Sequence, residues 1–340
     1  MTPSSTRKVI SVLGDGGWGT ALAIVLHNKG HKVTLWSAFA DYAATLKAKR
    51  ENVKFLPGVA LPPGLEVTVD MKAAAGAEML VAAVPTPYLR SVMKKLAECY
   101  VRGTPIVDVA KGIEAETMMR GSEVIRDVLG PDVPVAHLSG PSHAQEVARG
   151  LPTTVVAASS DLALARLVQQ AFMTERLRVY TNPDATGVEL GGALKNVIAI
   201  AGGICDGLGF GSNSKAALIT RGLAEIARLG VAMGAKRETF AGLTGLGDLI
   251  TTCVSPLGRN RYVGEQIGKG RKLREVLATM EQVAEGVLTT KAVCALADKY
   301  RVDMPITRQI HRVLFEDRDP LEAVAELMMR SPKAELEELQ

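Results

Sequence analysis

Residues 8–36 read KVISVLGDGGWGTALAIVLHNKGHKVTLW, and this stretch decides the fold of the first half of the chain. The apolar run at 8–13 is rich in valine and isoleucine and predicts a strand, which is followed at once by a glycine-rich turn. Residues 20–28 predict a helix that ends before Gly30, and residues 32–36 predict a second strand. A strand, a G-x-G-x-x-G turn, a helix and a strand within about 30 residues predict a dinucleotide-binding unit.

The glycines of this motif have separate physical roles. Gly14 permits the tight turn, Gly16 lets a pyrophosphate approach the backbone, and Gly19 lets the helix pack closely on the strand. The alternative is a plain glycine turn in an α/β protein. An acidic residue that would bind the ribose 2′-hydroxyl is missing after the second strand, where residues 37–39 are Ser, Ala and Phe. The sequence therefore leaves the choice between NAD and NADP open.

The alternation of strands and helices continues to about residue 181. Further strands are predicted at 66–69, 78–84, 105–110, 133–138, 153–158 and 178–181, and further helices at 88–99, 117–129 and 161–173. Repeated βα units predict a mostly parallel sheet covered on both faces, with ligands bound beyond the carboxyl ends of the strands. Pro85, Lys111 and residues 139–142 follow predicted strands and are candidates for that rim.

After Thr181 the strand patterns disappear and helical periodicity takes over. Helices are predicted at 189–204, 215–233, 261–268, 288–300, 304–315 and 319–329. The predicted fold class is therefore α/β, with a Rossmann-type, mostly parallel sheet domain at 1–182 followed by an all-α C-terminal domain at 183–340. We expect the helix that opens the second domain to join it to the first.

That opening helix contains residues 189–203, ELGGALKNVIAIAGG. Its apolar residues fall on one helical face, with Lys195 next to them and Gly191 and Gly192 one turn earlier. Glycine pairs are poor helix formers, so a close approach of another backbone or of a ligand would explain them. A lysine that is partly stripped of water has a lowered pKa and suits proton transfer. The alternative is a lysine whose stem only covers apolar surface.

A second polar segment lies at 245–261, GLGDLITTCVSPLGRNR. Asp248 stands before a short apolar helix, where capping the helix N-terminus would account for it without any catalytic role. Arg259 and Arg261 follow Gly258 and form a candidate clamp for a phosphate or carboxylate group. A surface loop is the alternative for this turn.

Composition narrows the class of protein. Hydrophobic residues make up 47% and charged residues 22%, which indicates a folded chain, and its 340 residues suggest two domains. Basic residues exceed acidic ones by only four (40 against 36) and are scattered, which argues against nucleic acid as a partner. The four cysteines and five histidines show no spacing typical of a disulfide framework or a metal site. The sequence shows no signal peptide or membrane span, so we expect a cytoplasmic enzyme or binding protein.

Several segments together resemble the bacterial type of NAD(P)-dependent glycerol-3-phosphate dehydrogenase. They are GDGGWGTALA at 14–23, VAKGIEAET at 109–117, SGPSHAQEVARGLPT at 139–153, ELGGALKNVIAIAGGICDGLGFGSNSKAALITRGLAE at 189–225, AGLTGLGDLITTCVSPLGRNR at 241–261 and VAEGVLTTKAV at 283–293. The matches cover nearly the whole chain in the family's order. The resemblance implies hydride transfer between NAD or NADP and dihydroxyacetone phosphate, giving sn-glycerol 3-phosphate for phospholipid synthesis. It also implies a homodimer and a phosphate-bearing substrate held between the two domains.

The resemblance also implies roles for individual residues. Lys195 would donate and accept the proton at C2, Lys111 would contact substrate and cofactor, and Asp248 would orient Lys195 and the substrate. The residues implied for the dinucleotide are Gly14, Gly16, Gly17, Trp18, Gly19, Lys111, Ala144, Arg259, Val283 and Glu285. The residues implied for the substrate are Lys111, Gly140, Ser142, Lys195, Asn196, Asp248, Gly258, Arg259 and Asn260, and no metal is implied.

Two positions depart from the family pattern. Asp15 stands where the family usually has a small residue, so we expect its side chain to turn away from the pyrophosphate. Ala38 and Phe39 stand where many relatives have arginine or histidine, which bears on affinity for a 2′-phosphate. Two other functions remain: a β-hydroxyacid dehydrogenase, whose substrates carry a carboxylate, and a dinucleotide-binding redox sensor without turnover.

Overall fold

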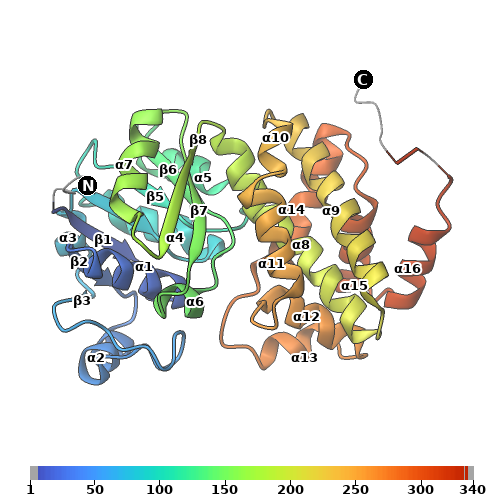
Figure 1. The fold of residues 1–340 in the computed structure, drawn as a ribbon, viewed down its shortest axis with the longest axis horizontal. Coiled ribbons are helices and arrows are strands. Elements are labelled where there is room, and N and C mark those ends of the chain that lie inside the picture. The colour runs from blue at the N-terminus through green and yellow to red at the C-terminus, as the bar shows by residue number, and fades with distance from the viewer. Residues whose placement is uncertain (1–6, 333, 336–340) are drawn as a thin grey trace.

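The computed structural model describes residues 7–332, 334 and 335. Figure 1 shows two parts side by side, a β-sheet flanked by helices in the first half of the chain and helices alone in the second. The strands are β1 (Val9–Leu13), β2 (Lys32–Trp36), β3 (Glu66–Thr68), β4 (Met79–Ala82), β5 (Ile106–Asp108), β6 (Val135–Ser139), β7 (Thr153–Ala158) and β8 (Leu177–Asn182). They form an eight-stranded sheet in the order β3-β2-β1-β4-β5-β6-β7-β8.

Strand directions and strand order confirm the predicted Rossmann-type, mostly parallel sheet. Neighbouring strands pair in parallel except for β6 and β7, which are antiparallel. The chain moves outward from β1 to β3 and then returns to the middle of the sheet at β4. In sheets of this kind, ligands bind beyond the carboxyl ends of the strands where the order reverses. This reversal lies between β1 and β4, next to the glycine-rich turn.

Helices cover both faces of the sheet, and buried side chains form an apolar cluster on each face. These helices are α1 (Gly17–Asn28), α2 (Ala40–Lys49), α3 (Met71–Ala75), α4 (Thr86–Ala97), α5 (Gly121–Leu129), α6 (Ala144–Ala148) and α7 (Leu162–Phe172). Sequence periodicity missed α2, α3 and α6. The last two are only five residues long, and α2 buries only two side chains, so neither length nor burial produces a clear pattern. The helix predicted at 117–129 begins only at Gly121, after a turn in which Met118 has a left-handed φ of 61°.

The glycine-rich turn has the geometry that its motif requires. Gly14 has a φ of 119°, a conformation that residues with a Cβ rarely adopt. A Cβ on Gly19 would lie 2.1 Å from the carbonyl oxygen of Gly14, so only glycine permits this approach of α1 to β1. No side chain caps the N-terminus of α1 and its first turn has no acidic residue. The amides at the start of α1 are therefore available to an anion.

The second half of the chain is helical and is built around α8 (Ala185–Gly207). The other helices are α9 (Ser212–Ala232), α10 (Arg237–Phe240), α11 (Asp248–Val254), α12 (Arg259–Gly268), α13 (Leu273–Ala278), α14 (Glu285–Tyr300), α15 (Pro305–Phe315) and α16 (Pro320–Met328). A π-helical turn, Leu243–Gly247, precedes α11. Helix α8 starts four residues before its predicted position because Asp184 caps it, accepting a hydrogen bond from the Gly187 amide at 2.9 Å.

Helix α8 is long and apolar enough to cross a membrane, by length and composition, but its most apolar window is entirely buried by the rest of the protein. Helices α9, α11, α12 and α14 pack around it, and α8 also contacts β6 and β7 of the sheet. Every residue from Gly187 to Cys205 is buried. Helix α8 is therefore the core helix of the second half and one of the elements through which the two halves meet.

Glycines allow the backbones of α8 and α12 to touch. A Cβ on Gly203 would lie 1.9 Å from the carbonyl oxygen of Arg261, and a Cβ on Gly264 would lie 1.9 Å from that of Ile200. Gly191 likewise faces the carbonyl oxygen of Thr244, which a Cβ would approach to 2.6 Å. The backbone approach that the sequence offered as one explanation of the glycine pair is confirmed at Gly191.

We predict that Gly203→Ala destabilises the protein by roughly 2 kcal/mol, because the added methyl group must push α12 away from α8 despite alanine's better helix propensity. Denaturant unfolding of the variant and the wild type measures this difference. Gly76→Ala is the matched control: Gly76 is exposed, and its Cβ would meet no atom closer than 3.7 Å. Equal stability of Gly203→Ala and the wild type would contradict the close packing of these helices.

Candidate active site

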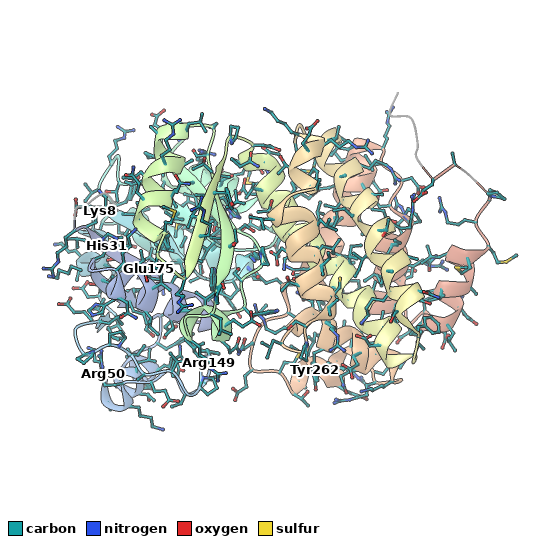
Figure 2. All side chains as sticks on the ribbon, viewed as in Figure 1. Lys8, His31, Arg50, Arg149, Glu175 and Tyr262 are labelled. Carbon is teal, nitrogen blue, oxygen red and sulfur yellow. The ribbon has the colours of Figure 1, made fainter. Side chains whose placement is uncertain are left out.

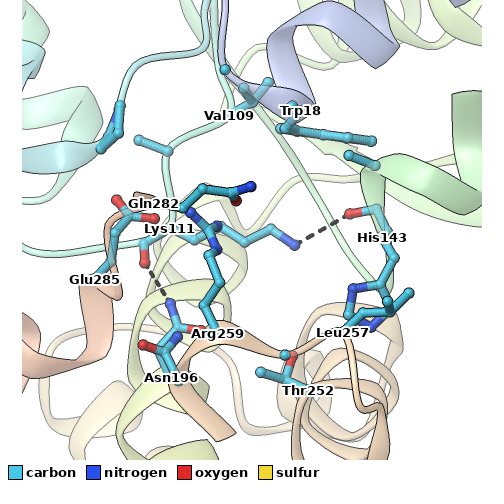
Figure 3. A pocket seen from close by; sticks show the side chains of 18 of the residues that line it. Trp18, Val109, Lys111, His143, Asn196, Thr252, Leu257, Arg259, Gln282 and Glu285 are labelled. Carbon is cyan, nitrogen blue, oxygen red and sulfur yellow. Dashed lines mark hydrogen bonds between the residues drawn. The ribbon is translucent and has the colours of Figure 1, made fainter. Parts of the chain in front are cut away.

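A cavity of about 200 Å³ lies between the carboxyl ends of the sheet strands and the helical part. It brings together most of the residues predicted for the site, from segments far apart in the sequence. Those that line it are Gly16, Gly17, Trp18, Lys111, Ser142, Ala144, Lys195, Asn196, Asp248, Gly258, Arg259, Asn260 and Glu285. Figure 3 shows Trp18 on one side of this cleft, Asn196 and Thr252 on the other, and Lys111 and Arg259 between them.

Four predicted site residues do not line the cleft. Gly14 and Gly19 shape the turn behind it, as described above. Gly140 and Val283 contribute backbone carbonyl oxygens instead: Gly140 accepts from Lys111 Nζ at 2.8 Å, and Val283 accepts from Arg259 Nη1 at 2.9 Å. These two residues hold cationic side chains of the cleft in place.

Asp248 lies between two lysines. Its Oδ1 is 2.9 Å from Lys195 Nζ and its Oδ2 is 2.8 Å from Lys111 Nζ. The side chains of Asp248 and Lys195 are 3% and 5% exposed, and that of Lys111 is 16% exposed. Two ammonium groups around one carboxylate leave one net positive charge in a largely buried site.

Three different elements deliver these groups. Lys195 lies on α8, Lys111 follows β5, and Asp248 is the first residue of α11, directly after the π-helical turn. No side chain caps the start of α11, so the alternative that Asp248 acts as a helix cap is wrong. The π-helical turn ends directly before Asp248, and such turns occur frequently at functional sites.

The remaining hydrogen bonds of the two lysines differ. Lys111 Nζ donates to Asp248, to the Gly140 carbonyl oxygen at 2.8 Å and to Ser142 Oγ at 3.3 Å, which occupies all three of its N–H groups. Lys195 Nζ donates to Asp248 and to Thr252 Oγ1. One N–H group of Lys195 therefore remains for a ligand in the cleft.

Burial and charge set the pKa values of this group. Burial lowers the pKa of Lys195 most strongly, Asp248 acts in the opposite direction and Lys111 adds to the lowering by repulsion, so that the pKa is about 8. Burial alone would raise the pKa of Asp248, but the two lysines outweigh it and hold that pKa below its usual value. Lys195 is thus an acid of moderate strength, while Asp248 stays ionised.

The start of α12 provides cationic and amide groups for an anion. Gly258 precedes this ten-residue helix without a side-chain cap, and Arg259 and Asn260 begin it and line the cleft. The prediction that Arg261 completes the clamp is wrong: its Nε lies 2.7 Å from Asp206 Oδ2 and its Nη1 3.3 Å from Glu265 Oε2. On a helix, residues two apart point in different directions, so one of the two arginines faces away from the cleft.

The first turn of α1 fits the phosphates of a dinucleotide. A Cβ on Gly16 would meet no atom within 4 Å, so the space before the helix is open, whereas a Cβ on Gly17 would lie 2.5 Å from the carbonyl oxygen of Phe55. Asp15 is buried, does not line the cleft, and has a pKa raised by burial. Its side chain is thus directed away from the open side of the turn, as expected.

A buried ionic cluster fastens α8 to the sheet. Glu189 on α8 pairs with Arg120 and accepts from the Ser122 amide at 2.9 Å. His137 Nδ1 lies 3.2 Å from Asp108 Oδ2 and 3.8 Å from Glu189 Oε1, and these two carboxylates raise the pKa of His137 against the effect of burial. The sequence predicted no metal site, yet Asp108, His137 and Glu189 come close enough to hold an ion. Arg120 already pairs with Glu189, and the His137 imidazole faces Asp108, so each of these two carboxylates has a partner within the cluster.

Sequence reasoning missed several residues of the cleft. Thr252 could have been found, because it lies four residues after Asp248 on the same helical face. His143, Phe55 and Gln282 also line the cleft, but no periodic pattern marks them.

Glu285 was predicted for the cofactor, and its Oε1 also accepts from the Thr86 amide at 2.8 Å and the Thr86 hydroxyl at 2.9 Å. It therefore links the helical part to the start of α4.

Comparison with known proteins agrees with the fold. Residues 9–165 match the family profile for the NAD-dependent glycerol-3-phosphate dehydrogenase N-terminus, and residues 184–325 match the one for its C-terminus. The glycerol-3-phosphate dehydrogenase (NAD(P)+) of Prosthecochloris aestuarii is 55% identical over 331 residues, covering 96% of this chain and all of the relative. A second such enzyme, from Salinibacter ruber, is 53% identical and covers 96% of each chain.

Solved structures of known proteins also share the fold of this chain. The glycerol-3-phosphate dehydrogenase of Coxiella burnetii superimposes with a TM-score of 0.92 at 42% identity, covering 95% of this chain and 99% of that one. A D-mandelate dehydrogenase with bound NADH shares the fold at a TM-score of 0.62 and 13% identity. The profiles, the full-length relatives and the solved structure together show that this chain belongs to the NAD-dependent glycerol-3-phosphate dehydrogenase family.

Proposed function

We propose that the protein catalyses reversible hydride transfer between NADH or NADPH and dihydroxyacetone phosphate, with sn-glycerol 3-phosphate as the reduced product. The observation that supports this most directly is the free N–H group of the buried Lys195, in a cleft between the glycine-rich turn and the start of α12. The glycine-rich turn fits a dinucleotide, and the start of α12 fits a phosphate group. The substrate carbonyl would then lie between them, beside Lys195.

We propose a corresponding division of the chain. Residues 1–182 would bind the dinucleotide and residues 183–340 would bind the substrate, with the boundary between the end of β8 at Asn182 and the start of α8 at Ala185. Gly16, Gly17 and Trp18 would hold the pyrophosphate, and Ala144, Val283 and Glu285 would lie along the rest of the cofactor. The nicotinamide supplies the hydride that reduces C2 of the substrate.

Lys195 is the proposed proton donor and acceptor. As C2 is reduced, negative charge develops on its oxygen, and the N–H group of Lys195 stabilises that charge and then transfers its proton. Asp248 and Thr252 orient the amine by accepting its other two hydrogen bonds. In the reverse direction the neutral amine removes the proton from the C2 hydroxyl.

Lys111 has a different proposed role. All its N–H groups are already paired, so it adds positive charge beside the reacting oxygen and holds Asp248 in place. Its longest hydrogen bond, to Ser142, is the one that a substrate oxygen would replace.

Gly258, Arg259 and Asn260 bind the phosphate, and this binding at the far end of the substrate fixes the position of C2. Asn196 donates to the Lys111 carbonyl oxygen at 2.8 Å and so supports the loop after β5.

We further propose, on the family resemblance, that the protein acts as a homodimer in the cytoplasm and supplies glycerol phosphate for phospholipid synthesis.

The purified protein is expected to oxidise NADH, NADPH or both when dihydroxyacetone phosphate is added, and Lys195→Met is expected to lower kcat by about 10²-fold or more, since the proton donor is lost. Absorbance at 340 nm with each nicotinamide in turn measures the rate and the cofactor preference. Binding of NADH, followed by fluorescence, should be nearly unchanged in this variant.

Lys299→Met is the control for removing a lysine charge, since Lys299 is exposed on α14. Activity with a β-hydroxyacid and none with dihydroxyacetone phosphate would instead indicate a hydroxyacid dehydrogenase. Tight binding of a nicotinamide without turnover of either substrate would indicate a redox sensor.

The pH dependence follows from the lowered pKa of Lys195. Reduction requires the ammonium form, so kcat should fall as pH rises through about 8, and oxidation should show the opposite trend. Asp248→Asn removes the negative charge that raises the pKa of Lys195, so this pKa should be lower in the variant. The pH at which kcat for reduction falls should therefore be lower by about one unit or more. Steady-state kinetics across pH, with the exposed Glu98→Gln as control, measure this shift. An unmoved limb in Asp248→Asn would show that another group controls the titration.

A further inference from the structure

His143 is a polar residue of the cleft that the mechanism above does not use. It follows Ser142 at the carboxyl side of β6 and directly precedes α6. His143 lines the same cavity as Lys111, Lys195 and Asp248, and Figure 3 shows its side chain on the side of the cleft near Leu257 and Thr252. Among the described residues, no group makes a hydrogen bond to its buried Nε2. A buried nitrogen without a partner is costly unless a ligand provides one.

Burial, together with two nearby ammonium groups, lowers the pKa of His143 and keeps its imidazole neutral. Burial lowers its pKa most strongly, and Lys195 and Lys111 lower it further, while Glu146 and Asp248 act in the opposite direction. The groups that face it are therefore two ammonium ions in the cleft, one carboxylate between them and one exposed carboxylate on α6. A neutral imidazole has one donor and one acceptor nitrogen, so in either tautomer Nε2 can pair with a hydroxyl group.

The proposed substrate has one polar group that lacks a partner in the mechanism. Dihydroxyacetone phosphate carries a phosphate, a carbonyl oxygen and a hydroxyl group at the end opposite the phosphate. In the proposed mechanism Arg259 and Asn260 bind the phosphate, and Lys195 donates a hydrogen bond to the carbonyl oxygen. The hydroxyl group is on the carbon bonded to the carbonyl carbon, so its oxygen is three bonds from the carbonyl oxygen that Lys195 holds.

We propose that His143 Nε2 hydrogen-bonds to the free hydroxyl group of dihydroxyacetone phosphate, and that His143 is thereby a specificity-determining residue. The inference rests on the proposed function, because it needs that substrate in the cleft. A hydroxyl group satisfies the nitrogen in either tautomer, whereas a methyl group at this position leaves the nitrogen buried and unpaired. Sites built to bind a substrate hydroxyl reject analogues that lack it.

The test compares dihydroxyacetone phosphate with hydroxyacetone phosphate, in which a methyl group replaces the hydroxymethyl group. The ratio of their kcat/KM values is measured for the wild type and for His143→Leu, His143→Gln and His143→Asn. The different intrinsic reactivity of the two ketones is the same for every variant and cancels when the ratios are compared. Glutamine places a polar atom near the position of Nε2, whereas asparagine is too short to do so.

The wild type should prefer dihydroxyacetone phosphate by about 10- to 100-fold beyond the ratio found for His143→Leu. His143→Gln should keep much of that preference and His143→Asn should lose it, a comparison that stands even if the leucine variant does not fold. Glu146→Gln is the matched control, because Glu146 is exposed on α6 and outside the cleft, and it should keep the wild-type ratio.

Equal ratios in the wild type and all three His143 variants would overturn the proposal while leaving the proposed reaction intact. A changed KM for the nicotinamide with unchanged ratios would overturn it as well, and would assign His143 to the cofactor. No reduction of either ketone by the wild type would overturn the proposed function and this inference together.

Discussion

The contact between one carboxylate and two ammonium groups holds this site together. Asp248 lies within 3 Å of both Lys195 and Lys111, and the three come from α11, α8 and the loop after β5. Removing one member of a buried ionic group typically costs about 3–5 kcal/mol, because the remaining charge is left uncompensated. The group carries one net positive charge, which suits an oxygen on which negative charge develops during reaction. The same contact joins the sheet part to the helical part at the point where the chemistry is proposed.

The rest of the structure keeps α8 in a fixed position relative to the sheet (Figure 2 shows the side chains of both parts on the ribbon). The ionic cluster around Glu189 anchors α8 about two turns before Lys195. Glycines at Gly191 and Gly203 bring the backbones of the π-helical turn and of α12 against the same helix. Helix α12 begins with Arg259, so its close packing on α8 also sets the distance between the anion-binding groups and the amine of Lys195.

The parts of this structure that depend on local sequence could be predicted, and the parts that depend on side chains from distant segments could not. The glycine-rich turn and its flanking strands were evident because steric limits on the backbone demand glycine there. Asp248 remained ambiguous, since a helix cap and a catalytic acid look alike in sequence, and only the neighbouring lysines decide between them. Arg261 was assigned wrongly because its partner Asp206 lies 55 residues earlier, on α8. The fold alone brings together Asp108, His137 and Glu189, so their spacing in the sequence could not predict this cluster.

A crystal structure of the protein with NAD and sn-glycerol 3-phosphate bound tests the central claim most directly. The account predicts the C2 oxygen within about 3 Å of Lys195 Nζ, the phosphate at Arg259 and Asn260, and the nicotinamide ring beside C2. A complex in which Lys195 stays paired only with Asp248 and Thr252, while the C2 oxygen contacts other groups, would contradict it.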